Sequence, residues 1–184
     1  ERSLYGLGRA HFELKQYNQA IQALDQLMKD YPKSGLFYEA KFLLGESYGE
    51  LGQVGEASLA LGDIFRFAAD QDLISRASMK LAQIQLKAGD QTGALASYQR
   101  IALLSDPNKP EQRPLIEEAI RLSLPISMAL QRYADALESC DQYLKLFPTS
   151  EKVADIRRIR AEANLKASTG APAAPTAPGT TAAQ

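Results

Sequence analysis

One pattern recurs along the chain at an interval of 37 residues, and this repeat constrains the fold more than any other feature. Small residues stand at two positions of each copy: Gly8 and Ala20, Gly45 and Ala57, Ala82 and Ala94. A small residue on each of two helices lets their backbones approach closely. The repeat therefore predicts a stack of similar helix pairs, in which each pair covers the apolar face that its neighbour leaves open.

The first copy shows what each pair contains. Two runs have helical spacing: Leu4, Leu7 and His11, and then Ala20, Leu24 and Leu27. Each run marks one face of a helix. Pro32 ends the second helix, because proline lacks the backbone donor that a helix needs. We call the first helix of a pair the A helix and the second the B helix, and we expect Gly8 to face Ala20 between them.

This pattern resembles the tetratricopeptide repeat (TPR). The residues that fit the family pattern are Leu4, Leu7, Gly8, Ala20, Leu24 and Pro32. His11 stands where the family usually has Tyr, and Leu27 stands where a small residue is usual. The resemblance implies an all-α fold, a TPR-type α-solenoid of about four helix pairs with a C-terminal capping helix. The interval exceeds the family's usual 34 residues by about one helical turn.

The repeats are expected near residues 3–34, 35–70, 71–106 and 114–148 of one solenoid domain that spans residues 1–167. The fourth copy is irregular, because Leu124 stands at the position of Gly8 and Pro125 should kink the A helix. A capping helix is expected over 150–167, with an apolar stripe on one side only: Val153, Ile156, Ile159 and Ala163. Residues 168–184 carry no charge and no large apolar side chain, which predicts a flexible Ala/Pro/Thr-rich tail.

A binding groove is implied by the resemblance, because TPR proteins usually contact a ligand through defined positions of their A helices. On this chain the expected groove residues are Tyr5, Arg9, Phe12, Phe42, Leu43, Glu46, Arg76, Met79, Lys80 and Gln83. Tyr5, Phe42 and Met79 are equivalent in successive copies, which predicts an apolar ladder suited to a peptide or helical segment of a partner. The alternative is that these three residues seal neighbouring A helices together.

Charged residues also align between copies. Arg9 is equivalent to Glu46, and Glu50 is equivalent to Lys87, so these residues are placed to pair across the groove. The alternative is a solvated face, because exposed ion pairs contribute only about 0.2–1 kcal/mol each. Some family members hold a C-terminal carboxylate in a cationic clamp. Only Arg76 and Lys80 keep the charge required at the equivalent positions, and this disfavours such a clamp.

Composition argues against several other functions. The net charge of −1 gives no field for nucleic acid, and no apolar run approaches the ~20 residues of a membrane span. Cys140 is the only cysteine, which excludes a disulfide within the chain, and its position matches that of Leu24, which predicts a packing role. No cluster of Cys and His has zinc spacing, so we expect no metal, no cofactor and no catalysis. His11 is expected to pack or to lie at the groove edge.

The segments Tyr31–Ser34 and Phe147–Ser150, together with the 37-residue interval, resemble a bacterial envelope subset of TPR proteins. That subset includes the lipoprotein of outer-membrane β-barrel assembly and the periplasmic coordinator of the Tol-Pal system. It implies a periplasmic or envelope location, with the cytoplasm as the alternative. Because the chain starts at Glu1, we expect a processed or excised chain.

Two functions follow from these patterns. The first is a scaffold or adaptor that binds a segment of a partner protein in its concave groove. The second is a structural spacer or self-assembling solenoid, suggested by a first helix that no earlier repeat covers.

Overall fold

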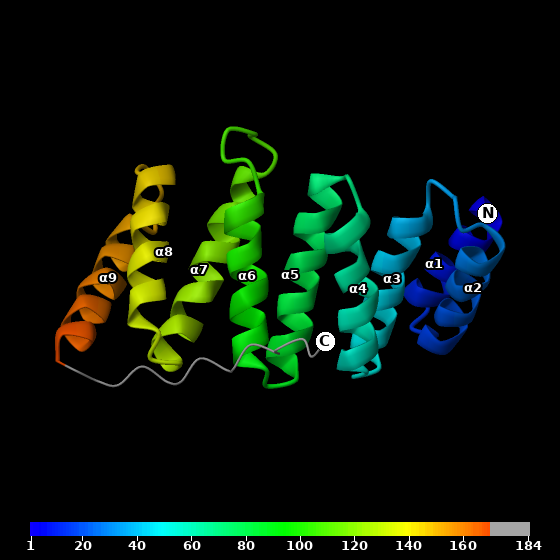
Figure 1. The fold of residues 1–184 in the computed structure, drawn as a ribbon, viewed down its shortest axis with the longest axis horizontal. Helices are drawn as coiled ribbons and strands as arrows, with labels where there is room; N and C mark the ends of the chain where they lie inside the picture. The colour runs from blue at the N-terminus through cyan, green and yellow to red at the C-terminus, as the bar shows by residue number, and fades with distance from the viewer. Residues whose placement is uncertain (170–184) are drawn as a thin grey trace, which may run out of the picture. The chain divides into compact units, whose positions relative to one another are not determined.

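The computed structural model of this chain describes residues 1–169, in which all regular structure is α-helical (Figure 1). The nine helices of this part are α1 (Arg2–Glu13), α2 (Tyr17–Asp30), α3 (Phe37–Glu50), α4 (Val54–Phe67), α5 (Gln71–Lys87), α6 (Gln91–Leu104), α7 (Arg113–Ala129), α8 (Tyr133–Leu146) and α9 (Val153–Ser168). The predicted fold class, a TPR-type all-α solenoid, is confirmed. Ser168 is the last residue of α9, and the rest of the predicted tail, apart from Thr169, lies outside the described residues.

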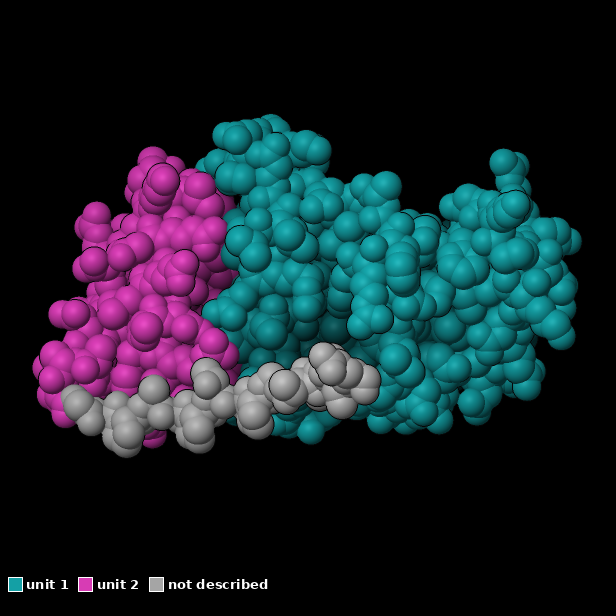
Figure 2. All heavy atoms as spheres, viewed as in Figure 1, with its two compact units in different colours: residues 1–119 teal, residues 120–184 magenta. Residues whose placement is uncertain are grey.

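Two compact units make up the chain, residues 1–119 and residues 120–184 (Figure 2). The first unit holds the pairs α1–α2, α3–α4 and α5–α6, followed by the start of α7. Each A helix packs against the B helix that follows it, and α2 also packs on α3 and α4 on α5. Each interior helix is thus covered on two sides, which is how stacked repeats bury the faces that a single pair would leave open.

Glycines in the A helices set the close approach within the first two pairs. A Cβ atom added to Gly8 would lie 2.8 Å from Leu24 Cγ, and one added to Gly45 would lie 2.5 Å from Leu61 Cγ. Both distances are shorter than van der Waals contact, so only glycine fits without a shift of the leucine. Ala20 also lies near Gly8, with its carbonyl oxygen 3.6 Å from the added Cβ, but the leucine makes the closest contact.

The turn from A helix to B helix repeats as well. One residue in each turn has positive φ: Lys15 (58°), Gly52 (73°), Gly89 (82°) and Gln131 (57°). The first three follow the 37-residue interval, and the fourth comes after a longer step that matches the irregular fourth copy. Glycine accepts this conformation at little cost, whereas the side chains of Lys15 and Gln131 are strained in it.

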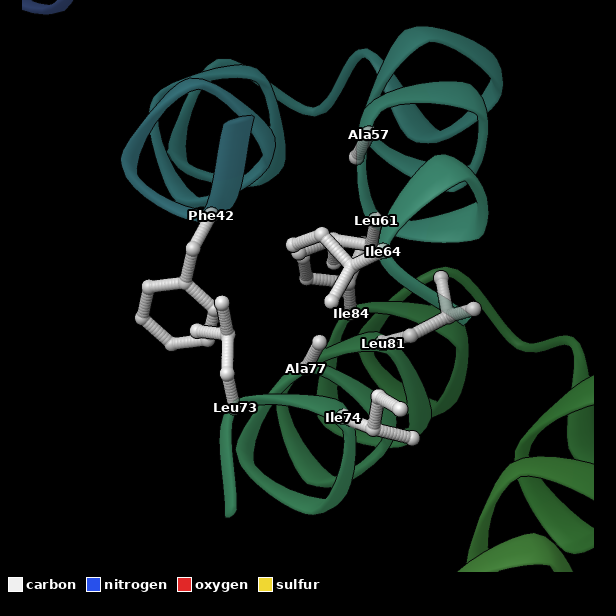
Figure 3. Close-up of a cluster of buried hydrophobic side chains, with 9 residues drawn as sticks. All are labelled: Phe42, Ala57, Leu61, Ile64, Leu73, Ile74, Ala77, Leu81 and Ile84. Atoms are coloured by element: carbon white, nitrogen blue, oxygen red, sulfur yellow. The ribbon is translucent and has the colours of Figure 1, made fainter. Parts of the chain in front are cut away.

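The apolar core of the first unit consists of clusters that bridge successive helices. One cluster joins α3, α4 and α5, and Figure 3 shows the ring of Phe42 of α3 beside Leu73 of α5. A second cluster joins the first and second helix pairs through Leu24 and Leu27 of α2 and Leu44 of α3. Because these clusters are shared between pairs, a pair without its neighbours would expose them to water.

The second unit contains the end of α7 together with α8 and α9. Helix α7 continues through Pro125, which is exposed, and the predicted kink stays a prediction. Helix α9 packs on α8 through Ile156 and Ala163, which are 1 % and 0 % exposed, while most of its other side chains face water. This one-sided burial agrees with the stripe predicted for the capping helix.

Candidate functional site: the face of the A helices

The three A helices of the first unit lie next to one another, because α1 contacts α3 and α3 contacts α5. The B helices α2, α4 and α6 make only weak contacts with each other, or none. A stack whose A helices are closer than its B helices curves toward the A helices. We call the surface formed by the outward residues of α1, α3 and α5 the A-face, and the predicted groove residues lie on these three helices.

Three of the predicted groove residues are core residues in the free protein. Phe42, Leu43 and Met79 are 9 %, 6 % and 8 % exposed. Phe42 packs into the α3–α5 cluster (Figure 3), and Leu43 packs into the cluster that joins the first two pairs. An exposed apolar ladder is therefore not present, and this expectation is corrected. Contact between successive A helices buries Phe42, as the alternative interpretation expected.

The remaining predicted groove residues stay accessible. Arg9, Arg76 and Gln83 are exposed, while Tyr5, Phe12, Glu46 and Lys80 are partly buried. Phe12 makes an edge-on contact with the ring of Tyr17, with ring centroids 5.6 Å apart. The accessible A-face is therefore polar and charged, with Tyr5 and Phe12 as its partly buried aromatic members.

Ion pairs connect α3 to α5 across the A-face. Arg76 Nη1 lies 3.5 Å from Glu39 Oε1, and Lys80 Nζ lies 2.8 Å from Glu46 Oε1. The guanidinium of Arg76 also lies 4.8 Å above the ring of Phe42, which it shields from water. These pairs hold the second and third A helices together and fix where the charges of the A-face lie.

The ion pairs differ from those predicted. Within residues 1–169, Arg9 pairs with Glu13 of its own helix at 3.4 Å, and Glu46 pairs with Lys80, so the pairing of Arg9 with Glu46 that the aligned charges suggested is not formed. Arg9 reaches a carboxylate one turn along α1 more easily than one on the neighbouring helix. The described residues show no ion pair between Glu50 and Lys87 either.

Tyr5 lies within the field of the charges on all three A helices. Burial raises the pKa of its hydroxyl, the carboxylates of Glu39 and Glu46 raise it further, and the guanidinium groups of Arg9 and Arg76 oppose the shift. The hydroxyl is therefore protonated at neutral pH and can donate or accept a hydrogen bond. Tyr5 offers a neutral contact between charged neighbours, which suits recognition of a polar segment better than proton transfer.

The two cations that a carboxylate clamp would use are already paired, since Arg76 lies beside Glu39 and Lys80 beside Glu46. A bound carboxylate would have to compete with these acidic side chains. This competition is a second reason against a carboxylate clamp, besides the missing residues in the sequence. What the A-face offers is a set of alternating charges, with side-chain exposure of 44 % at Arg76 and 33 % at Glu39.

The chemically reactive residues occupy structural positions. His11 Nδ1 lies 2.6 Å from Gln16 Oε1, at the end of α1. Cys140 is fully buried, and burial raises the pKa of its thiol to about 11, as the predicted packing role requires. Across residues 1–169, no group of three or more His, Cys, Asp or Glu side chains is placed to hold a metal ion. In the same part of the chain, no helix is both long and apolar enough to cross a bilayer.

Sequence reasoning missed two features of the A helices and their surroundings. The first is the ion pair of Glu39 with Arg76, for which the interval of one repeat between the two residues was the available signal. A pocket between α4 and α6 was also missed, because small side chains on two separate helices form it and no motif marks them.

Comparison with known proteins gives one match. The family model described as Tetratricopeptide repeat matches residues 2–34 and 76–104, together about a third of the chain. The first range contains α1 and α2, and the second contains most of α5 and all of α6. This match supports a TPR protein. A search of curated proteins finds no match.

Proposed function

We propose, from the premise of a TPR-type solenoid, that this chain is a scaffold that binds a segment of another protein on its A-face. TPR repeats are in general protein–protein interaction modules. The observation that carries the proposal is the accessible set of charges on α1, α3 and α5, with Tyr5 in their field. A segment with alternating charges would exchange its ion pairs with those of the A-face.

The preferred partner segment is polar, because three apolar residues that the sequence predicts for the groove, Phe42, Leu43 and Met79, are buried. Phe42 packs against α5, and Met79 is buried as well, so both offer little surface. The partner would therefore contact Arg9, Arg76 and Gln83 at the surface and reach Tyr5 by a hydrogen bond. Such a surface favours an extended or helical segment with charged side chains over one with a continuous apolar stripe.

Gly6 gives a sharp test of the A-face. It lies in α1 and is exposed, and a Cβ atom added there would meet no other atom within 4 Å. Gly6→Leu should therefore add bulk to the A-face without disturbing the core. Gly55→Leu, on the B helix α4, is the matched control, since its added Cβ also meets nothing within 4 Å.

The experiment is affinity purification of the full chain from its native cells, with partners quantified by mass spectrometry. We expect one partner to be depleted at least about tenfold with Gly6→Leu and retained with Gly55→Leu. Equal recovery of every partner with both variants would rule out the A-face as the binding surface.

A second function, stacking of chains end to end, is favoured by one observation. Leu7 of α1 is 48 % exposed and Leu14, just after α1, is 68 % exposed, so the first pair carries uncovered apolar surface. Sedimentation velocity over a wide range of concentrations tests this function. A concentration-dependent increase in size that Leu7→Glu abolishes would favour stacking, and a monomer at every concentration would exclude it.

The envelope location is a further proposal, supported by the segments Tyr31–Ser34 and Phe147–Ser150 and by the 37-residue interval. Fractionation of native cells into cytoplasm, periplasm and membrane, with detection of the chain in each fraction, tests it. Recovery in the cytoplasm alone would contradict it.

A further inference from the structure

A pocket of about 350 Å³ lies on the B helices of the first unit, away from the A-face. On one side it is lined by Ser58, Gly62, Phe65 and Arg66 of α4. On the other side it is lined by Gly93, Ala96, Ser97 and Arg100 of α6. We call this pocket the B-groove.

The floor of the B-groove is rigid. It is formed by Leu81 and Gln85 of α5, and Leu81 belongs to the buried α3–α5 cluster (Figure 3). Gln85 Oε1 accepts a hydrogen bond of 2.8 Å from the hydroxyl of Ser97. A floor held by core packing and by a hydrogen bond keeps its shape when a ligand enters.

A glycine leaves room on the α4 wall of the groove. An added Cβ at Gly62 would meet no atom within 4 Å, so the space beside this glycine is open. On the opposite wall, Ala96 of α6 is exposed, whereas Asp90 and Gln85 occupy the space beside Gly93. Small residues let the backbone of another element come close, as between packed helices.

Arg100 carries a charge into this pocket without a counter-ion. Its Nη1 atom is buried and has no hydrogen-bond partner among residues 1–169, and its guanidinium lies 4.6 Å over the ring of Phe65. Burial lowers the pKa of the guanidinium, but an arginine stays charged at neutral pH. A buried donor without an acceptor destabilises a protein, so an acceptor that enters the B-groove is favoured.

A second cation strengthens this charge. Arg66 is exposed at the same pocket and makes no ion pair within the described chain. None of the residues that line the pocket is acidic. The B-groove therefore complements a negative charge on whatever occupies it.

Exposed leucines flank the groove. Leu59 is 74 % exposed and lies three residues before Gly62, on the same face of α4. Leu103 is 81 % exposed and lies three residues after Arg100, on the same face of α6. Two apolar side chains beside a groove with cationic walls are the contacts that an amphipathic helix would make.

From these observations we propose that the B-groove docks an amphipathic helix of a partner protein, with an acidic side chain of that helix bound by Arg100 and Arg66. The apolar face of the helix would cover Leu59 and Leu103. The carboxylate would accept a hydrogen bond from the buried Nη1 atom of Arg100, and the backbone of the partner helix would approach α4 at Gly62. This site is separate from the A-face, so the chain would hold two partners at once.

A displayed library of 16-residue helical peptides, randomised on one face, is the probe. It is selected on the full chain and then sequenced. We expect enriched peptides to carry Asp or Glu at one position between apolar residues. Gly62→Leu should fill the groove and reduce binding of the enriched peptides at least about tenfold, whereas Gly6→Leu, on the A helix α1, should leave it unchanged.

Charge variants test the acidic contact directly. One enriched peptide is synthesised together with its Glu→Gln or Asp→Asn form, and both are titrated by fluorescence anisotropy. Because a hydrogen bond to a charged group is involved, the neutral form should bind about 10- to 100-fold more weakly to the native chain. Arg66→Glu changes an exposed side chain and should weaken the acidic peptide without affecting the fold. A peptide with Lys at that position should regain affinity for Arg66→Glu.

Several results would overturn the proposal: enriched peptides without an acidic residue, binding that survives Gly62→Leu, or a dimer in sedimentation that Gly62→Leu abolishes. The dimer would assign the B-groove to a second copy of the chain. Gly6→Leu separates this test from that of the A-face, because it should leave peptide binding at the B-groove intact. If the peptide tests contradict binding at the B-groove but Gly6→Leu still depletes a partner in the affinity purification, the proposed function of the A-face is unaffected.

Discussion

Three glycines in the helices of this chain, Gly45, Gly49 and Gly62, have opposite roles. Gly45 and Gly49 each face a core side chain, Leu61 and Ile84, at a distance that a Cβ atom would not tolerate. Gly62 faces open space. The same substitution should therefore have opposite effects on stability at these positions.

We expect Gly45→Ala to lower the free energy of unfolding by about 1–3 kcal/mol, because the added Cβ overpacks the contact with Leu61. Gly62→Ala should raise it by about 0.5–1 kcal/mol, because alanine favours the helix. Urea denaturation followed by circular dichroism measures both. A stabilising effect of Gly45→Ala would show that α3 and α4 are not packed as closely as described.

Positive φ gives a second prediction at the residue scale. Lys15 has a φ of 58° in the turn where the next two copies have glycine. Lys15→Gly should raise the free energy of unfolding by about 1 kcal/mol, because glycine removes the strain of the left-handed conformation. Gly89→Ala should lower it by a similar amount. The two variants are compared by urea denaturation, and equal signs would contradict the turn geometry.

Cys140 makes stability depend on pH. Burial raises the pKa of its thiol to about 11 from an ordinary value of 9.0. Because the folded pKa is raised, the stability from the protonated thiol is complete below pH 9 and is lost as pH rises through 11. In Cys140→Ala, the fall in unfolding free energy between pH 9 and pH 11 should be shallower by about 1 kcal/mol per pH unit. Identical slopes in both proteins would show that the thiol is not buried.

At the scale of helices, ion pairs join α3 to α5. The side chains of Lys80 and Glu46 are 33 % and 16 % exposed, so water screens their interaction only in part. A double-mutant cycle with Lys80→Gln and Glu46→Gln should give a coupling of about 0.2–1 kcal/mol at low salt. The coupling should fall in 1 M salt, where charges are screened within about 3 Å. No coupling at low salt would show that the ion pair of Lys80 with Glu46 does not help to hold α3 and α5 together.

The helix pairs could be predicted from the sequence because their signals are local. Gly8 and Leu24 lie on consecutive helices of one pair, and their repeat at Gly45 and Leu61 places the same contact in the next pair. Burial of Phe42 could not be predicted in this way. Spacing along α3 gives the face on which Phe42 lies, but the tilt of α5 decides whether that face is covered.

Contacts between helices of different pairs could not be predicted from the sequence, for a related reason. The pair of Lys80 with Glu46 joins residues at different positions of successive repeats, so aligning the copies does not reveal it. The B-groove depends on the small side-chain volume at Gly62 and Ala96, which lie on helices separated by α5. Repeated apolar residues mark a core in the sequence, but no comparable pattern marks a space between helices.

For the whole molecule, the central claim is that a partner binds on the A-face. A photo-crosslinking amino acid placed at Gln83, which is exposed on α5, tests it most directly in native cells. The control position is Gln19, which is exposed on the B helix α2. We predict one covalent adduct from position 83 that is absent from position 19 and is lost when Gly6→Leu is added. Adducts of equal yield from both positions, or an adduct from position 83 that Gly6→Leu leaves unchanged, would contradict the claim.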